Sequence, residues 1–163
     1  MKLAILSDTH DNIWALDRAV HWIGQAGAVI HCGDLCSPFM VPRIAQAAAG
    51  KPIHIVWGNN DGDKRLLMMQ ANRAGTVTIH GDIALFELDG LKIAVNHYPE
   101  VGRALAASGN FDLVCYGHDH TACEEQIGKT LLINPGEVMG LFGRRTLVLF
   151  DTSNRAVEWI EFE

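Results

Sequence analysis

The sequence has no cluster of basic residues and no long hydrophobic run. Its 13 Lys and Arg residues are outnumbered by 19 Asp and Glu residues, which gives a formal net charge of -6. Nonspecific nucleic-acid binding draws most of its affinity from neutralised phosphates, so we expect no stable nucleic-acid binding. The apolar start turns polar at Ser7 and Asp8, too early for a signal peptide, and no segment approaches the ~20 apolar residues of a membrane span. We therefore expect a cytoplasmic protein without membrane association.

Cysteine is scarce and shows no metal-binding pattern. The four cysteines, Cys32, Cys36, Cys115 and Cys123, form no Cys-x-x-Cys pair. A four-thiolate zinc site is therefore disfavoured. In a chain without export features, reduced thiols are the simplest state.

The length and composition indicate a single domain spanning residues 1–163. The chain is 48% hydrophobic and 20% charged, far from the composition of disordered proteins. At this size, roughly two thirds of the exposable surface can be buried. No internal repeat or linker is visible, and the four tryptophans fit core or partly buried positions.

Hydrophobic periodicity in the first half predicts alternating strands and helices. We expect strands at 2–7, 28–31 and 53–57, and helices from Asn12 to the glycines at 24 and 27, from Ser37 to about 49, and at 63–74. This alternation predicts parallel strands with helices outside, and such folds collect their sites at the carboxyl ends of the strands.

The second half is rich in short strands. We expect them at 76–80, 83–88, 91–96, 113–116, 122–127, 130–133, 146–151 and 156–162, with one short helix at 99–108. Hairpin turns are predicted at Gly81-Asp82, Asp89-Gly90, Gly128-Lys129 and Ser153-Asn154. Because these strands are too many for one small sheet, we predict two stacked sheets with helices outside.

Five short segments place metal-ligating residue types directly after predicted strands. They are Asp8-Thr9-His10, Gly33-Asp34, Gly58-Asn59-Asn60-Asp61, Asn96-His97 and Gly117-His118-Asp119-His120. Each is common by itself, but their joint occurrence at successive strand ends predicts one shared metal centre.

Two divalent ions held about 3.5 to 4 Å apart need one bridging carboxylate and several nitrogen or oxygen ligands. Asp34 is the natural bridge. The remaining candidates are Asp8, His10 and His120 for one ion, and Asn59, His97 and His118 for the other. Two ions, two carboxylates and a bridging hydroxide leave a positively charged centre that attracts phosphate. A ligand set without thiolate suits manganese, iron, cobalt, nickel or zinc, and we take manganese as the expected ion.

In this order the segments resemble the calcineurin-like metallophosphoesterase superfamily, whose pattern is D-x-H, G-D, G-N-x-D/E, a lone His and G-H-x-H. Asn134-Pro135-Gly136 is also similar to the N-P-G turn of its small prokaryotic phosphodiesterase branch. The resemblance covers nearly the whole chain. It implies an α/β (α+β) fold, namely a four-layer αββα sandwich of two mixed β-sheets with flanking helices and the metals at the carboxyl ends of the strands.

The chain departs from the family pattern at several positions. Many relatives carry His where this chain has Asn60, and that His is thought to protonate the leaving group. Its absence favours diesters or good leaving groups. Asp61 is expected to orient a ligand or act on a water. Tyr98 is expected to narrow or stack against the substrate cleft, and Asn60 to contact the substrate. Glu137 replaces the Ser usual after N-P-G and adds negative charge near the phosphate site.

The resemblance implies a binuclear metal-dependent phosphodiesterase, in which a metal-bridging hydroxide attacks phosphorus in line. A phosphomonoesterase or nucleotide pyrophosphohydrolase is the alternative within the same chemistry. A non-catalytic scaffold is the alternative of another class, because the retromer subunit that shares this fold serves as one. A small phosphate ester is the expected partner, and a homodimer is compatible with the hairpin strands, which leave sheet edges free to pair.

Overall fold

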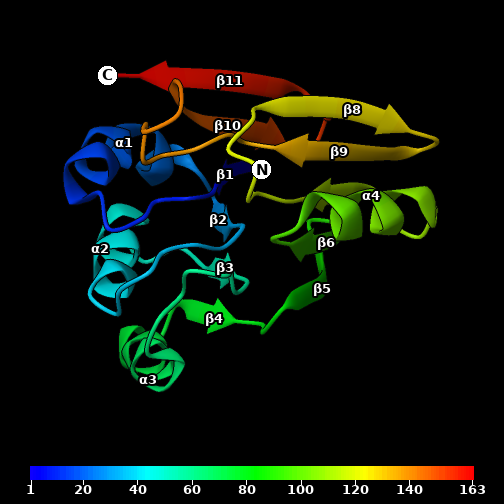
Figure 1. Cartoon of the computed structure of the whole chain (residues 1–163). Coiled ribbons are helices and arrows are strands. Elements are labelled where there is room, and N and C mark those ends of the chain that lie inside the picture. The colour runs from blue at the N-terminus through cyan, green and yellow to red at the C-terminus, as the bar shows by residue number, and fades with distance from the viewer.

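The strands form two separate sheets in the computed structural model, which describes residues 1–163 (Figure 1). The first sheet has the order β11 (Val157–Phe162), β10 (Arg145–Asp151), β1 (Lys2–Leu6), β2 (Ala28–His31), β3 (Ile53–Ile55) and β4 (Val77–Ile79). The second has the order β5 (Ile83–Leu88), β6 (Leu91–Asn96), β7 (Leu113–Cys115), β9 (Thr130–Asn134) and β8 (Cys123–Ile127). Both sheets mix parallel and antiparallel pairs.

Four helices cover the outer faces of the two sheets. The helices α1 (Ile13–Gln25), α2 (Met40–Ala47) and α3 (Lys64–Ala74) lie beside one another along the first sheet. The helix α4 (Pro99–Ala107) packs on β6, β7 and β9 of the second sheet. The expected four-layer αββα arrangement is therefore confirmed. None of these helices has the length and apolar character needed to cross a bilayer.

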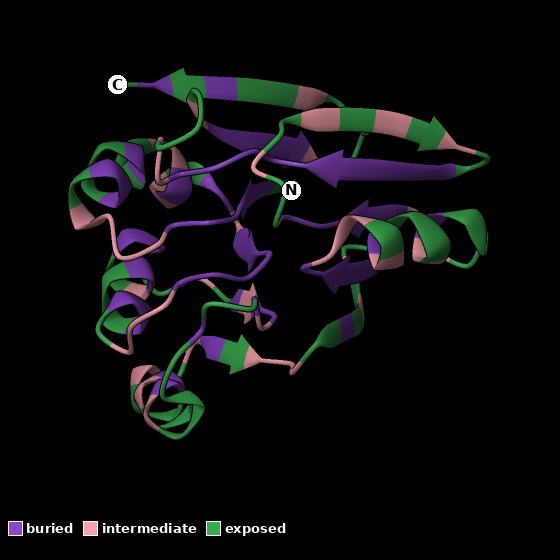
Figure 2. Cartoon of the chain, viewed as in Figure 1, coloured by how far each residue is buried: buried purple, intermediate pink, exposed green.

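Side-chain alternation on the strands divides the core into layers. On β1, Leu3 and Ile5 join the core between the sheets, whereas Ala4 and Leu6 join the core beneath the helices. This follows from the two-residue period of a strand that is buried on both faces. Figure 2 shows the result, with β1 and β2 buried and each helix exposing its outer side.

Local signals account for most helix ends. The Asn12 side chain accepts a hydrogen bond from the Ala15 N–H, and Asp63 does the same for Leu66, so both act as N-caps. Gly75 ends α3 in the left-handed conformation, at φ 73°. Gly24, expected to end the first helix, lies within it, and Ala26 is the C-cap.

The second helix is shorter than predicted, because it begins at Met40 and not at Ser37. Pro42 lies in its first turn. A missing N–H costs no helical hydrogen bond there.

The prediction of a hairpin at Gly81-Asp82 is wrong. The strand before it, β4, pairs in parallel with β3, and the strand after it, β5, begins the second sheet. The chain is held to the first sheet because the His80 N–H donates to the Ile55 carbonyl and the Trp57 N–H to the Gly81 carbonyl. The other three predicted turns do join antiparallel neighbours.

Candidate metal centre

Loops that follow parallel strands of both sheets meet at one site. From the first sheet, Asp8 follows β1, Asp34 follows β2 and Asn59 follows β3; from the second, His97 follows β6 and His118 and His120 follow β7. Parallel strands direct their carboxyl ends to the same edge, so residues far apart in sequence converge. The structure brings all seven predicted ligands together, each within 3.6 Å of at least one other.

The first group of donor atoms surrounds Asp8. Its Oδ1 lies 3.3 Å from Nε2 of His120 and 3.6 Å from Nε2 of His10. Asp8 Oδ1 and His10 Nε2 are buried and have no hydrogen-bond partner. Buried polar atoms without partners are costly. Ligand atoms of Asp8, His10 and His120 lie within 4.8 Å of one another, and this convergence fits a divalent cation.

The second group surrounds Asp34. Its Oδ2 lies 3.4 Å from Nε2 of His97 and also 3.4 Å from Nε2 of His10. The Asn59 Oδ1 lies 3.0 Å from the same His97 nitrogen and 2.8 Å from Nδ1 of His118. One Asp34 oxygen therefore faces both groups, which is the position that a bridging ligand requires.

The carboxylates of the site are held in their charged form. Burial raises the pKa of Asp34, but hydrogen bonds from His97 and Asn60 outweigh it and leave the pKa well below the usual range. Burial likewise raises the pKa of Asp8, and the neighbouring His10 ring, together with the hydrogen bond from the Ser7 hydroxyl, outweighs it. The Asp8 carboxylate in turn raises the pKa of His10. The site thus concentrates negative charge on two buried aspartates.

Buried His31 holds two of these loops together. Gly33 donates its N–H to His31 Nδ1, so Nε2 carries the proton and donates to the Thr9 hydroxyl at 2.6 Å. Burial lowers the pKa of His31 to about 4, so this ring stays neutral. It connects the Asp8 loop to the Asp34 loop without facing the candidate ligands.

Glycines allow the loops to approach the carboxylates closely. A Cβ atom at Gly58 would lie 2.0 Å from Asp34 Oδ1, and one at Gly117 would lie 2.0 Å from the Ser7 hydroxyl. The site also contains left-handed non-glycine residues, a conformation that is strained for L-residues and concentrates at functional sites. They are Asp8, His10, Asp11, Asp34, Cys36, His118 and His120.

Asp61 is an anchor for the loops that carry the candidate ligands. Its carboxylate accepts backbone N–H groups of Asp34, Cys36 and Gly58 at 3.2, 2.8 and 2.7 Å. Asn60 donates both its backbone N–H and its side-chain amide to Asp34, each at 2.8 Å. Both residues therefore contact the bridge position directly.

Aromatic side chains line two sides of the site. The Tyr98 ring lies 5.0 Å from the His118 ring, and the Phe142 ring lies 5.1 Å from the His120 ring. Phe142 and its neighbour Leu141 are 75% and 67% exposed. Trp14 is 73% exposed, so its expected burial is wrong. Residues 141–142 carry no motif, and only their apolar character after N-P-G would have drawn attention to them.

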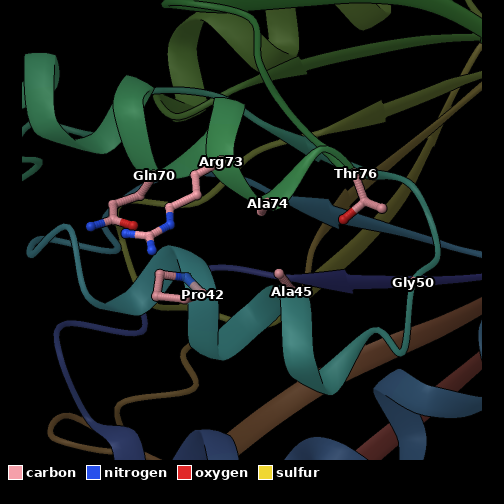
Figure 3. A pocket seen from close by; sticks show the side chains of 7 residues that line it. All are labelled: Pro42, Ala45, Gly50, Gln70, Arg73, Ala74 and Thr76. Atoms are coloured by element: carbon pink, nitrogen blue, oxygen red, sulfur yellow. The ribbon is translucent and has the colours of Figure 1, made fainter.

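The cavity with the largest volume, about 550 Å³, lies away from these residues (Figure 3). It is lined by α2, α3 and the segments leading into β3 and β4, and it contains no carboxylate or histidine. A smaller cavity of about 230 Å³ borders His120, and Arg144 lines it as well. Only this smaller one touches the candidate centre.

Comparisons with known proteins identify relatives of this chain. The family model of the calcineurin-like phosphoesterase superfamily domain matches residues 1–155. The chain is 33% identical over 168 residues to the phosphodiesterase MJ0936 of Methanocaldococcus jannaschii, with both chains fully covered. It is 27% identical over 151 residues to the phosphodiesterase YfcE of Escherichia coli K12, covering 85% of this chain and 79% of the relative.

Solved structures share the fold. An archaeal phosphodiesterase superposes with a TM-score of 0.91 at 32% identity, covering 99% of this chain and all of the other. A Vps29 mutant from Entamoeba histolytica superposes with a TM-score of 0.70 at 16% identity, with both chains fully covered. The second likeness concerns the fold alone.

Proposed function

The chain belongs to the calcineurin-like phosphoesterase superfamily, and we propose that it is a binuclear metal-dependent phosphodiesterase. One observation carries the binuclear assignment. The Asp34 Oδ2 atom lies 3.4 Å from a histidine nitrogen of each donor group. The phosphodiesterase that is 33% identical over the full length supports the reaction class.

The proposed ligands are the seven residues that converge at the strand ends. Asp34 is the bridge, Asp8, His10 and His120 complete the first ion's site, and Asn59, His97 and His118 complete the second. Their free nitrogen and oxygen atoms suit divalent transition metals. Bound there, two such ions supply Lewis-acid polarisation of phosphate oxygens and a water nucleophile at neutral pH.

The residues around the proposed ligands position those ligands or border the substrate. The Asp61 carboxylate accepts the backbone N–H of Asp34 and so fixes the position of Asp34. Asp61 is therefore a positioning residue and does not act on a water. Tyr98, at the edge of the His118 ring, narrows the cleft on one side. Asn60 is exposed and donates its amide to Asp34, which supports a role for it in contacting a phosphate oxygen.

The histidines favour a diester or a good leaving group. Four of the eight are proposed ligands, and the other four are engaged elsewhere. His31 bonds Thr9, His54 and His80 contact each other, and His21 contacts Gln25. No histidine is left to protonate a poor leaving group, and position 60 offers only an amide.

A direct test compares chromogenic mono- and diesters of phosphate with a nucleotide that contains a diphosphate bond, using metal-stripped protein with and without manganese. We expect manganese to restore hydrolysis and the diester to be preferred. Preference for the monoester or for a nucleotide diphosphate bond would establish the alternative activity. Metal binding without turnover of any ester would favour the scaffold alternative or a cleft that excludes these generic substrates.

The bridging role has its own test. Asp34→Asn removes the charge that faces both donor groups while keeping the side-chain shape. We expect loss of both metal binding and turnover, with Asp17→Asn on the exposed face of α1 as a matched control. A variant that keeps most of its activity would contradict the assignment.

We further propose manganese as the resident ion, a cytoplasmic location and a homodimer. Four free cysteines agree with a reducing compartment. Ile83 and Leu85 are 43% and 59% exposed on the edge strand β5, which suits pairing with a second copy. Metal analysis of the purified protein, fractionation of cells and sedimentation of Leu85→Asp against the wild type test the three proposals.

A further inference from the structure

Glu137 is a fully buried carboxylate that lies behind the candidate centre. It follows β9 at the end of Asn134-Pro135-Gly136, and its side chain is 0% exposed. Its Oε2 lies 2.8 Å from Nδ1 of His120. Its Oε1 accepts the backbone N–H groups of Phe142 and Gly143, both at 2.8 Å.

No lysine or arginine pairs with this carboxylate, and the one basic side chain that contacts it is His120. Burying a charge without an opposite charge beside it costs free energy. A buried glutamate that contacts a candidate metal ligand on one side and a loop on the other therefore points to function more than to stability.

We propose that Glu137 is a positioning residue that sets both the tautomer of His120 and the place of the loop at 140–143. The inference rests on the proposed metal site. Both Glu137 oxygens lie in acceptor positions, Oε1 for two backbone N–H groups and Oε2 for the His120 ring at 2.8 Å, so His120 carries its proton on Nδ1. The lone pair of Nε2 then faces Asp8 Oδ1, 3.3 Å away, which is where the first ion would bind.

The same carboxylate fixes the apolar rim of the site. Its bonds to the N–H groups of Phe142 and Gly143 hold the Phe142 ring against the His120 ring, 5.1 Å between centroids. The segment in between is bonded to the ligand loop, because Met139 donates its N–H to the Asp8 carbonyl. One buried group therefore links a metal ligand to an exposed aromatic surface.

This rim implies a class of substrate. An exposed phenyl ring beside the phosphate site contacts an apolar or aromatic alcohol group far better than a small polar one. We infer that the ester group on the His120 side is aromatic or apolar, and that Phe142 favours it.

Glu137→Gln separates the two roles, because an amide has one acceptor oxygen. If that oxygen keeps the loop bonds, the NH₂ group faces Nδ1 of His120. Because NH₂ is a donor, Nδ1 must then accept, and the His120 proton moves to Nε2. The reverse orientation would set the NH₂ group against both N–H donors of the loop, so we expect the first arrangement. We expect manganese affinity, measured by calorimetric titration, to fall by about 10- to 100-fold, as for other residues that orient metal-bound histidines.

Phe142→Ala tests the substrate preference, because it removes the ring and keeps the backbone N–H bonded to Glu137. We expect unchanged manganese affinity, and a raised KM for an aryl diester but not for a methyl diester. Unchanged manganese affinity in Glu137→Gln, or equal KM changes for both esters in Phe142→Ala, would overturn the corresponding half of the proposal.

The tautomer is tested without any variant or metal. Long-range ¹H–¹⁵N spectra of the metal-free protein identify which His120 nitrogen carries the proton, and we expect Nδ1. A proton on Nε2 would overturn the positioning role even if Glu137→Gln fails to fold. If the wild type binds no manganese, the proposed function fails, while this spectrum still decides the role of Glu137.

Discussion

Asp61→Asn distinguishes an anchoring residue from a reacting one. The Asp61 carboxylate accepts three backbone N–H groups, two on Oδ2 and one on Oδ1. An asparagine oxygen can replace Oδ2 and keep the bonds from the N–H groups of Asp34 and Gly58. The asparagine NH₂ group then faces the N–H of Cys36. One bond to a charged acceptor is lost, at about 1.5–3 kcal/mol, and a donor is left unsatisfied.

Part of this loss is offset, because burial raises the pKa of Asp61 and the amide carries no charge to bury. We therefore expect the free energy of unfolding to fall by about 2 kcal/mol, which lowers the melting temperature by roughly 4–8 °C at this chain length. Manganese affinity should fall as well, because the Asp34 backbone loses its fixed position.

The assay is urea unfolding of the metal-free variant, followed by calorimetric titration with manganese. Asp63→Asn is the control, since it makes the same change two residues away at the N-cap of α3, where Asn serves as well as Asp. If Asp61→Asn lost turnover but unfolded within about 0.5 kcal/mol of the wild type, Asp61 would act in the reaction and the anchoring argument would be wrong.

Three further predictions use the same methods. Burial lowers the pKa of His54 to about 4 from 6.5, so between these pH values the unfolded chain binds more protons than the folded one and stability falls as pH falls. Between pH 7 and 5 the free energy of unfolding of the wild type should therefore fall by about 1 kcal/mol more than that of His54→Gln, a value discounted for the partial exposure of the ring. Equal losses in urea titrations would refute this. Gly117→Ala should lower the free energy of unfolding by about 1–3 kcal/mol, because the added methyl group would overlap the Ser7 hydroxyl. Gly143→Ala should not lower it, because a methyl group there meets open space. Manganese at 100 times its Kd should raise the free energy of unfolding by about 2.7 kcal/mol in the wild type and not in Asp34→Asn. Equal shifts of the melting temperature in the two proteins would place the metal elsewhere.

The candidate site is largely predictable from the sequence because its parts are local. A short apolar run predicts a buried strand, and the polar residues that follow must lie at its carboxyl end. Asp8 and Asp34 follow this rule within the first sheet, so their convergence needs only the assumption of parallel strands. His97, His118 and His120 follow strands of the second sheet, so their convergence with the aspartates also needs the two sheets to stack, which the number of predicted strands indicates.

What the sequence does not predict depends on contacts between distant segments. Gly81 has good hairpin chemistry, but the bond from His80 to the Ile55 carbonyl decides which sheet β4 joins. The left-handed backbone of Asp8, at φ 54°, is held by its N–H bond to the Gly33 carbonyl, and nothing near Asp8 in the sequence signals it. Position 137 is unpredictable for the same reason, since its partners lie at His120 and in the loop beyond it.

The charge distribution gives an independent reason to expect a cation. The ion pairs that Asp8 and Asp34 make are with histidines alone, and every lysine and arginine pair lies elsewhere. Two buried carboxylates repel each other across a region of low dielectric unless cations lie between them. A fold selected for stability alone would place a guanidinium or an apolar pair there. Because the surrounding backbone is strained and the glycines are set for close approach, the loops are shaped around the space between Asp8 and Asp34, and divalent ions at that place would satisfy both carboxylates at once.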